Sequence, residues 1–119
     1  MWTKRLVAPW VRAKSLDWSA QPGDPVIAGA GDVACDPYTP GFNDGFPSPS
    51  SCHQMATSDE LLRMDLDKVF MLGDAQYEDG AAAKFALSYD PSWGRLKPIT
   101  VPVIGNHESH YPAAWRAYW

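Results

Sequence analysis

The stretch Lys68-Val69-Phe70-Met71-Leu72 followed by Gly73-Asp74-Ala75-Gln76-Tyr77 decides the fold. An apolar run of this length that stops at a glycine is typical of a buried β-strand. Two further runs, 25–28 and 100–104, lead in the same way to Gly31-Asp32 and to Gly105-Asn106-His107-Glu108. Ligands of open α/β sheets bind at the carboxyl ends of the strands. We therefore expect the three polar blocks to lie together at one edge of a sheet.

The order of the expected elements predicts an α/β fold. Strands are expected at about 25–30, 67–72 and 100–104, with helices at about 51–64 and 79–87. The first helix should present Met55, Leu61, Leu62 and Met64 as its apolar face, although it could begin later, near Ser58. Asp79 should be the N-cap residue of the second helix. Strands that alternate with helices imply right-handed crossovers and a mainly parallel sheet. Residues 92–96 read as a turn or short helix, and 113–119 as the start of a helix or strand.

Composition indicates one globular domain. The chain has 119 residues, 45% of them hydrophobic, and a net charge of −4. Its apolar runs are too short for a membrane span, and it lacks the basic surface that nucleic-acid binding requires. Residues 1–24 carry a basic head and end in a turn cluster, so they are expected to be a poorly ordered leader to a domain at 25–119.

Two cysteines, Cys35 and Cys52, flank a proline-rich segment that reads as a long surface loop. They permit either one disulfide or two free buried thiols. A disulfide would favour an extracytoplasmic location, although the apolar start of the chain is interrupted by Arg12 and is not a readable signal peptide.

The polar blocks carry the donors of a metal site. Asp32 and Asp74 would repel each other at a shared edge unless a cation or a proton lay between them, and the blocks contain no Lys or Arg. Divalent metal is the simplest counter-charge, and a carboxylate in the central block can bridge two ions. Asn106 offers an amide oxygen to a second ion. His107 could donate a proton to a phosphate oxygen or to a leaving group.

Taken together, Asp32, Gly73-Asp74 and Gly105-Asn106-His107-Glu108 resemble the first three motifs of the calcineurin-like metallophosphoesterases. The block Gly73-Asp74-Ala75-Gln76-Tyr77 is similar to that of the purple acid phosphatase branch. This resemblance implies two metal ions of the Fe, Zn or Mn class and a phosphate-ester substrate. It makes Asp32 and Tyr77 ligands of the first ion, Asp74 the bridge, Asn106 a ligand of the second, and His107 the catalytic contact to phosphate.

The sequence also departs from that family. Ala34 stands where many members have a histidine, a loss that Tyr77 would compensate. The family's later histidine motifs are not in this chain, whose other histidines are His53 and His110. The resemblance therefore implies a truncated metallophosphoesterase sandwich, the N-terminal half of a catalytic domain, with an uncovered apolar face. We expect such a piece to associate with itself or with a missing C-terminal half.

Other interpretations stay open. Tyr77 could simply pack with its hydroxyl hydrogen-bonded, and Glu108 could orient its loop through hydrogen bonds. The run 29–34 fits a dinucleotide fingerprint, but a proline-rich loop follows it where a helix should begin. The chain as a whole could be a phosphoesterase, a non-catalytic fragment that binds a metal weakly, or an interaction module that uses its tryptophan-rich ends. The sequence does not distinguish monoester from diester substrates.

Overall fold

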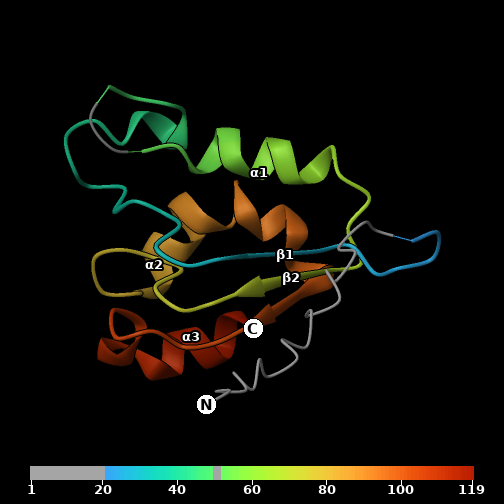
Figure 1. Ribbon diagram of the computed structural model, residues 1–119. Helices are drawn as coiled ribbons and strands as arrows, with labels where there is room; N and C mark the ends of the chain where they lie inside the picture. Colours follow the sequence, from blue (N-terminus) through green and yellow to red (C-terminus); the bar gives the residue numbers. More distant parts are fainter. Residues whose placement is uncertain (1–20, 50–51) are drawn as a thin grey trace, which may run out of the picture.

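A computed structural model describes residues 21–49 and 52–119 and shows an α/β fold built on a three-stranded parallel sheet (Figure 1). Strand β1 is Ile27–Ala30, β2 is Lys68–Met71 and β3 is Thr100–Pro102, in the order β1-β2-β3. Ala28 pairs with Val69 and Val69 with Thr100, which fixes the register across the sheet. The α/β class and the parallel pairing that the sequence predicted are confirmed.

The helical segments between and after the strands are short. They are η1 (Asn43–Gly45), α1 (Gln54–Leu62), α2 (Ala82–Lys84), the π-helical turn η2 (Phe85–Tyr89), η3 (Trp93–Ile99), η4 (Glu108–His110) and α3 (Pro112–Tyr118). The end of the chain is therefore helical, and 92–96 belongs to a longer 3₁₀ helix. Within the described part of the chain, no helix is long and apolar enough to cross a membrane.

Two helix starts differ from the sequence prediction. Helix α1 begins at Gln54 rather than near Ser58, whereas the expected start at Ser51 lies outside the described residues, as do residues 1–20 of the expected leader. Helix α2 begins at Ala82 with Ala81 at its N-cap. Asp79 is therefore not the N-cap residue. Its carboxylate instead accepts a hydrogen bond from the backbone amide of Ala81, 3.2 Å away, just before the helix begins.

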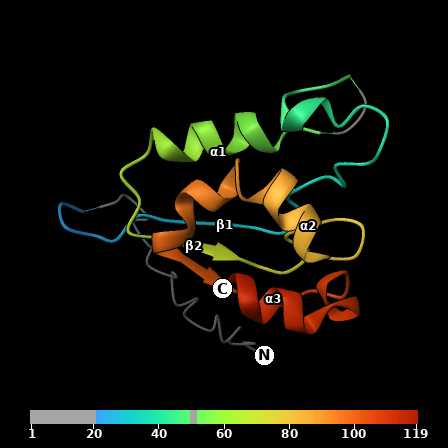
Figure 2. The same ribbon diagram turned by 180° about the vertical axis from the view of Figure 1, so that it is seen from behind.

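The interior lies on one side of the sheet. Val69 and Met71 point from β2 into a cluster formed with Phe85, Tyr89, Trp93 and Leu96 of η2 and η3. Tyr118 of α3 closes this cluster, with its ring 4.6 Å from that of Phe85. Seen from behind, the helical segments lie in front of the strands (Figure 2).

The strands are buried on one side only, which agrees with the uncovered apolar face expected from the sequence. Residues alternate between buried and exposed along β2, and the exposed ones are Lys68 and Phe70.

The predicted apolar face of α1 is correct only in part. Met55 and Leu61 are half-buried, and Leu61 packs against the interior, but Leu62 is exposed and Met64 lies beyond the helix and is exposed. The helix also buries Gln54 and Ser58. Both polar side chains have partners, because Gln54 donates to Ser88 Oγ and Ser58 Oγ accepts from Arg95.

Candidate functional site

The segments that follow β1 and β2 continue side by side past the ends of the strands. The amide of Val33 donates to the carbonyl of Asp74 at 3.1 Å, and the amide of Ala34 donates to that of Ala75 at 2.9 Å. Ala34 and Gln76 then form an isolated parallel bridge. These bonds place the first two polar blocks next to each other, as their position after parallel strands predicts.

Both aspartates have left-handed backbone conformations. The φ angle is 55° at Asp32 and 50° at Asp74. Gly73, directly before Asp74, is also left-handed at φ 98°. Aspartate tolerates this region better than most residues, and strained backbone of this kind gathers at functional sites.

The third block is packed directly against the second. A Cβ added to Gly105 would overlap the amide nitrogen and the carboxylate of Asp74, so only glycine fits there. Asp74 Oδ1 also accepts the backbone amide of His107 at 3.0 Å. Asn106 lies between Gly105 and His107 in the chain and is exposed. The structure therefore brings the second and third blocks together.

The Glu108 side chain links the second block to the third. Its side chain is fully buried, and its two carboxylate oxygens accept the amides of Gln76 and Gly105, each at 2.9 Å. Charge-assisted bonds of a buried carboxylate are among the stronger hydrogen bonds in proteins. Glu108 thus holds the loops after β2 and β3 in one arrangement, which is the orienting role that the sequence indicated.

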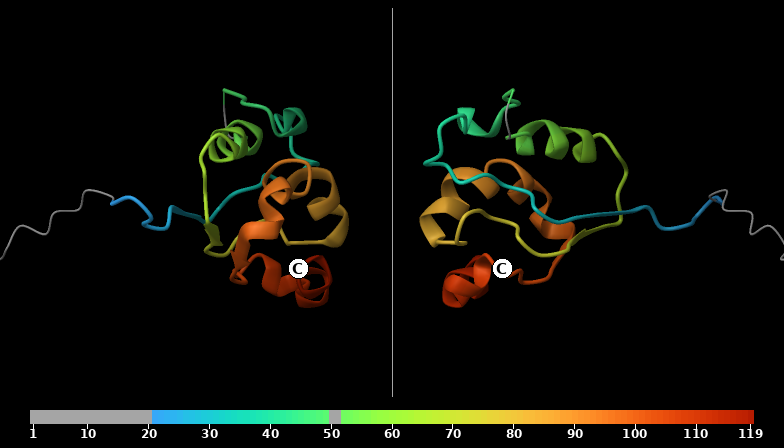
Figure 3. Two further views of the ribbon diagram at one scale, coloured as in Figure 1. Left: turned by 90° about the vertical axis from the view of Figure 1, so that its right-hand side faces the viewer. Right: turned by 60° about the vertical axis from the view of Figure 1, so that its left-hand side comes forward.

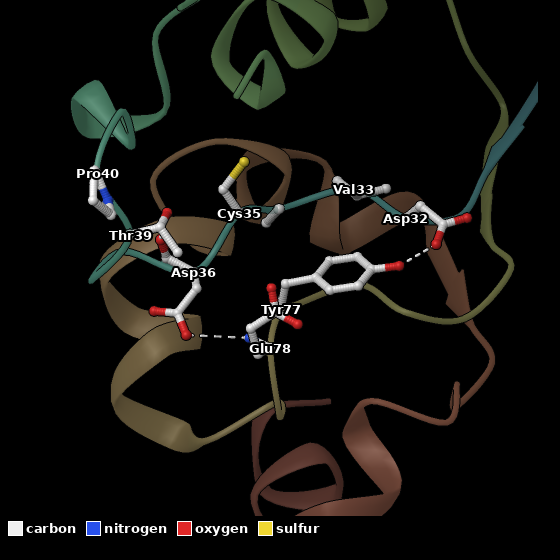
Figure 4. Close-up of a pocket in the computed structure, with 9 residues that line it drawn as sticks. Asp32, Val33, Cys35, Asp36, Thr39, Pro40, Tyr77 and Glu78 are labelled. Carbon is white, nitrogen blue, oxygen red and sulfur yellow. Dashed lines mark hydrogen bonds between the residues drawn. The ribbon is translucent and has the colours of Figure 1, made fainter. Parts of the chain in front are cut away.

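Tyr77 joins the first block to the second through its side chain. Its hydroxyl donates a short hydrogen bond to Asp32 Oδ1 (Figure 4). Its ring lies 4.3 Å from the ring of His107. Burial, and then the bond to Asp32, raise the pKa of the Tyr77 hydroxyl. In this structure the phenol is therefore a hydrogen-bond donor to a carboxylate, which is the packed arrangement that the sequence left open.

The imidazole of His107 has one nitrogen engaged. Its Nδ1 lies at hydrogen-bond distance from the backbone carbonyl of Glu78, an atom that only accepts. Nδ1 therefore carries a proton, and Nε2 is the nitrogen available to a ligand. The Glu78 carboxylate stands 3.9 Å from Nδ1.

A cavity of about 280 Å³ opens beside Asp32 and Tyr77 (Figure 4). Its walls also include Asp36 and Glu78, and Thr39 and Pro40 close its far side. A second cavity of about 200 Å³ lies between Asp32 and the start of α1, where His53 contributes to the wall. Asp32 stands between the two cavities, so a group bound at its carboxylate would have space on both sides.

Sequence reasoning missed the supports of this site. Lys84 binds Asp36 at 2.6 Å and Asp79 at 3.0 Å, and these ion pairs tie the segment after β1 to the segment after β2. The Gln76 side chain is buried and donates to the carbonyls of Cys35 and Tyr77. Gln76 lies inside the central block, but a single sequence gives no sign that it points inward.

Cys35 and Cys52 form a disulfide, with Cα atoms 5.8 Å apart. Of the two alternatives that the sequence left open, the structure adopts the disulfide rather than the free thiols. The bond connects the segment after β1 to the residues just before α1, and it closes the proline-rich loop.

The donors suit hard metal ions by type, since they are carboxylate, amide and phenol oxygens. However, residues 21–49 and 52–119 contain no group of three or more His, Cys, Asp and Glu side chains placed to hold a metal ion. Comparison with protein-family models, curated proteins and solved structures gave no match to this chain. A metal site at these residues therefore stays a prediction, drawn from the type of the donors.

Proposed function

We propose that this chain carries part of a phosphoesterase centre in which two metal ions hold a phosphate ester. The observation that supports this most is the junction of Asp32, Asp74 and the Gly105–Glu108 loop at the carboxyl ends of three parallel strands. Asp74 is central, because its carboxylate lies against the backbone of the third block and its carbonyl binds the segment that follows β1. A bridging carboxylate needs such a position.

Each residue has a defined task in this proposal. Asp32 and Tyr77 would hold the first ion, Asn106 would hold the second, and Asp74 would hold both. The ions, of the Fe, Zn or Mn class, would neutralise phosphate charge and activate water. The Glu78 carbonyl keeps a proton on Nδ1 of His107, so Nε2 would be the nitrogen that meets the substrate. Protonated at both nitrogens, it donates a proton to a phosphate oxygen or to the leaving group.

Binding of the first ion requires Tyr77 to change partners. Its hydroxyl now donates to Asp32, and a phenolate ligand would have to give up that proton. The bond already places the phenol oxygen beside the carboxylate with which it would share the ion. Release of the Tyr77 proton is therefore coupled to metal binding.

The proposal is tested by metal-dependent hydrolysis of p-nitrophenyl phosphate. Asp74→Asn should lower metal-stimulated kcat/KM by about 100-fold or more, because an amide is a poor bridge between two cations. Asp65→Asn, which alters an exposed carboxylate outside the blocks, should leave the rate unchanged. Activity that survives Asp74→Asn would refute the role of Asp74, and a chelator should abolish the activity of the parent chain.

A second candidate is a non-catalytic fragment that binds one metal ion weakly. It is favoured by the lack, among residues 21–49 and 52–119, of three clustered His, Cys, Asp or Glu ligands. It predicts a metal-dependent rise in thermal stability that Asp74→Asn removes, with no turnover by either protein. Turnover by the parent chain would exclude it.

The partners proposed for the chain are the phosphate ester and either a second copy or a missing C-terminal half. An interaction module that uses the tryptophan-rich ends is the remaining alternative. It predicts that changes in the three blocks affect neither metal binding nor association.

A further inference from the structure

The buried side chain of Gln76 makes hydrogen bonds at both of its polar atoms. Gln76 is 0% exposed. Its Nε2 donates to the carbonyl of Cys35 at 2.9 Å and to that of Tyr77 at 2.7 Å, and its Oε1 accepts the amide of Tyr89 at 3.1 Å. A buried amide with these partners holds them in one arrangement, because a broken bond would leave a buried polar group without a partner.

Through its side chain and its backbone, Gln76 contacts the segments that follow β1 and β3, and it lies itself on the segment after β2. Cys35 is on the segment after β1. The Gln76 backbone amide donates to the Glu108 carboxylate, after β3, at 2.9 Å. Tyr89 belongs to η2, which lies between α1 and α3 in both views of Figure 3 (orange). Gln76 therefore stands where the loops of the candidate site meet the helical side of the fold.

The bond to the Tyr77 carbonyl fixes the backbone of the tyrosine that reaches Asp32. The Tyr77 amide donates to the carbonyl of Ala34 at 2.9 Å, so the amide and the carbonyl of Tyr77 are both held by buried residues. A fixed backbone also fixes the direction of the Cα–Cβ bond, and so the side of the site that the ring can reach. That side holds the Asp32 carboxylate, which the phenol meets (Figure 4).

We propose that Gln76 is a positioning residue, which acts through the Tyr77 backbone to keep the phenol at Asp32. The inference rests on the proposed function, in which Asp32 and Tyr77 are the ligands of the first ion. Removal of a hydrogen-bond partner that orients a metal ligand typically lowers metal affinity or activity by about 10–100-fold. The side-chain bonds of Gln76 go to the segments after β1 and β2 and to η2, so the loss should fall on the first ion rather than on Asn106.

Two variants separate this role from a contribution to the stability of the interior alone. Gln76→Met removes the amide but keeps a side chain of similar length, so the Tyr77 carbonyl loses its donor. The matched control is Ser88→Ala. Ser88 is 2% exposed and its hydroxyl donates to the same Cys35 carbonyl at 2.7 Å, but this bond does not involve Tyr77. Both variants lose a buried hydrogen bond and should be less stable than the parent, whereas only Gln76→Met should affect the phenol.

The test is a double-mutant cycle measured by urea unfolding of the full 119-residue chain without metal. Tyr77→Phe deletes the hydroxyl that bonds Asp32 and should lower the urea midpoint of the parent. In the Gln76→Met background the same change should lower the midpoint by less than about half as much, because the phenol is no longer held at Asp32. In the Ser88→Ala background it should lower the midpoint by the full amount.

An equal loss of midpoint in all three backgrounds would overturn the proposal, because Gln76 would then contribute to stability without acting on Tyr77. No loss in the parent would also overturn it, because the phenol would then not be held at Asp32. Circular dichroism checks that each variant is folded. If Gln76→Met does not fold, Gln76→Asn takes its place in the cycle, since it shortens the side chain and withdraws the amide from the Tyr77 carbonyl.

Hydrolysis of p-nitrophenyl phosphate then links the role of Gln76 to the proposed function. Gln76→Met should lower metal-stimulated kcat/KM at least about tenfold, and adding Tyr77→Phe to it should cost little more. Ser88→Ala should stay within about twofold of the parent. A parent without turnover would contradict the proposed function, whereas the cycle in urea would still decide the role of Gln76. An active parent whose kcat/KM Gln76→Met leaves unchanged would overturn the positioning role.

Discussion

At the scale of single residues, the site depends on close backbone packing. Gly105 and Asp74 touch so closely that the position of the Asp74 carboxylate is set by the absence of a side chain at Gly105. Glu108 then holds both loops through its two oxygens. Metal ligands are effective only where the surrounding shell fixes them, so these contacts matter as much as the donors themselves.

Gly105→Ala should therefore destabilise the chain and displace Asp74. Relieving the overlap requires a backbone shift, and such overpacking costs about 1–3 kcal/mol. The matched control is Gly29→Ala, because a Cβ there meets its nearest atoms at an ordinary 3.7 Å. Urea unfolding measures both variants. Equal midpoints for the two would show that the contact between Gly105 and Asp74 is not tight in solution.

The position of these residues could be predicted from the sequence, but their supports could not. Glycine-bounded apolar runs predicted that Asp32, Asp74 and Gly105 would meet, since parallel strands end at a common edge. Lys84 and Gln76 were missed because their partners are remote in sequence or are backbone carbonyls. A single sequence carries no record of such pairings.

At the scale of elements, the errors have one cause. Periodicity predicts which side of a helix is apolar, but it does not predict which residues from other parts of the chain pack against the helix. Helix α1 buries Gln54 and Ser58 because Ser88 and Arg95, more than 30 residues away in sequence, supply polar partners. Runs such as Val69-Phe70-Met71-Leu72 lack polar alternation and so predicted buried strands. In the structure one side of β2 is buried and the other is exposed, which agrees with the expected uncovered face.

The disulfide acts at this scale, because it connects the end of the β1 segment to the approach to α1. Its sequence separation is 17 residues, and closing a loop of that size stabilises a folded protein by about 3 kcal/mol. Reduction of the parent should lower its unfolding free energy by about that amount. A variant with both cysteines replaced by serine should start at the lower value and not respond to reductant. Identical stability of the reduced and oxidised parent would contradict the expectation.

At the scale of the whole molecule, one ion-pair network links the loops on which the fold and the site depend. Asp36, 9% exposed at its side chain, and Asp79 both bind Lys84, which joins the segment after β1 to α2. Burial alone would raise the pKa of the Asp36 carboxyl. The bond to Lys84 and the amides of Tyr38 and Glu78 outweigh burial, so its pKa lies below the ordinary 3.8. The pKa of Asp79 is lowered for a similar reason.

These lowered pKa values make stability depend on acid in a defined direction. Near pH 4, Asp36 and Asp79 bind fewer protons in the folded chain than in the unfolded chain. Their contribution to the free energy of unfolding is therefore complete above that pH and is lost as the pH falls through their lower pKa values in the folded chain.

Asp36→Asn should be less stable than the parent by about 2 kcal/mol at pH 7, since a charged hydrogen bond is lost. The difference should begin to shrink as the pH falls below about 3.8, where Asp36 of the unfolded parent becomes protonated, and should vanish below the lower pKa that Asp36 has in the folded chain. Urea midpoints measured from pH 7 to pH 3 follow this convergence, with Asp65→Asn as the control that matches the parent throughout. A difference that stays constant across this range would show that Lys84 does not hold Asp36 ionised in the folded chain.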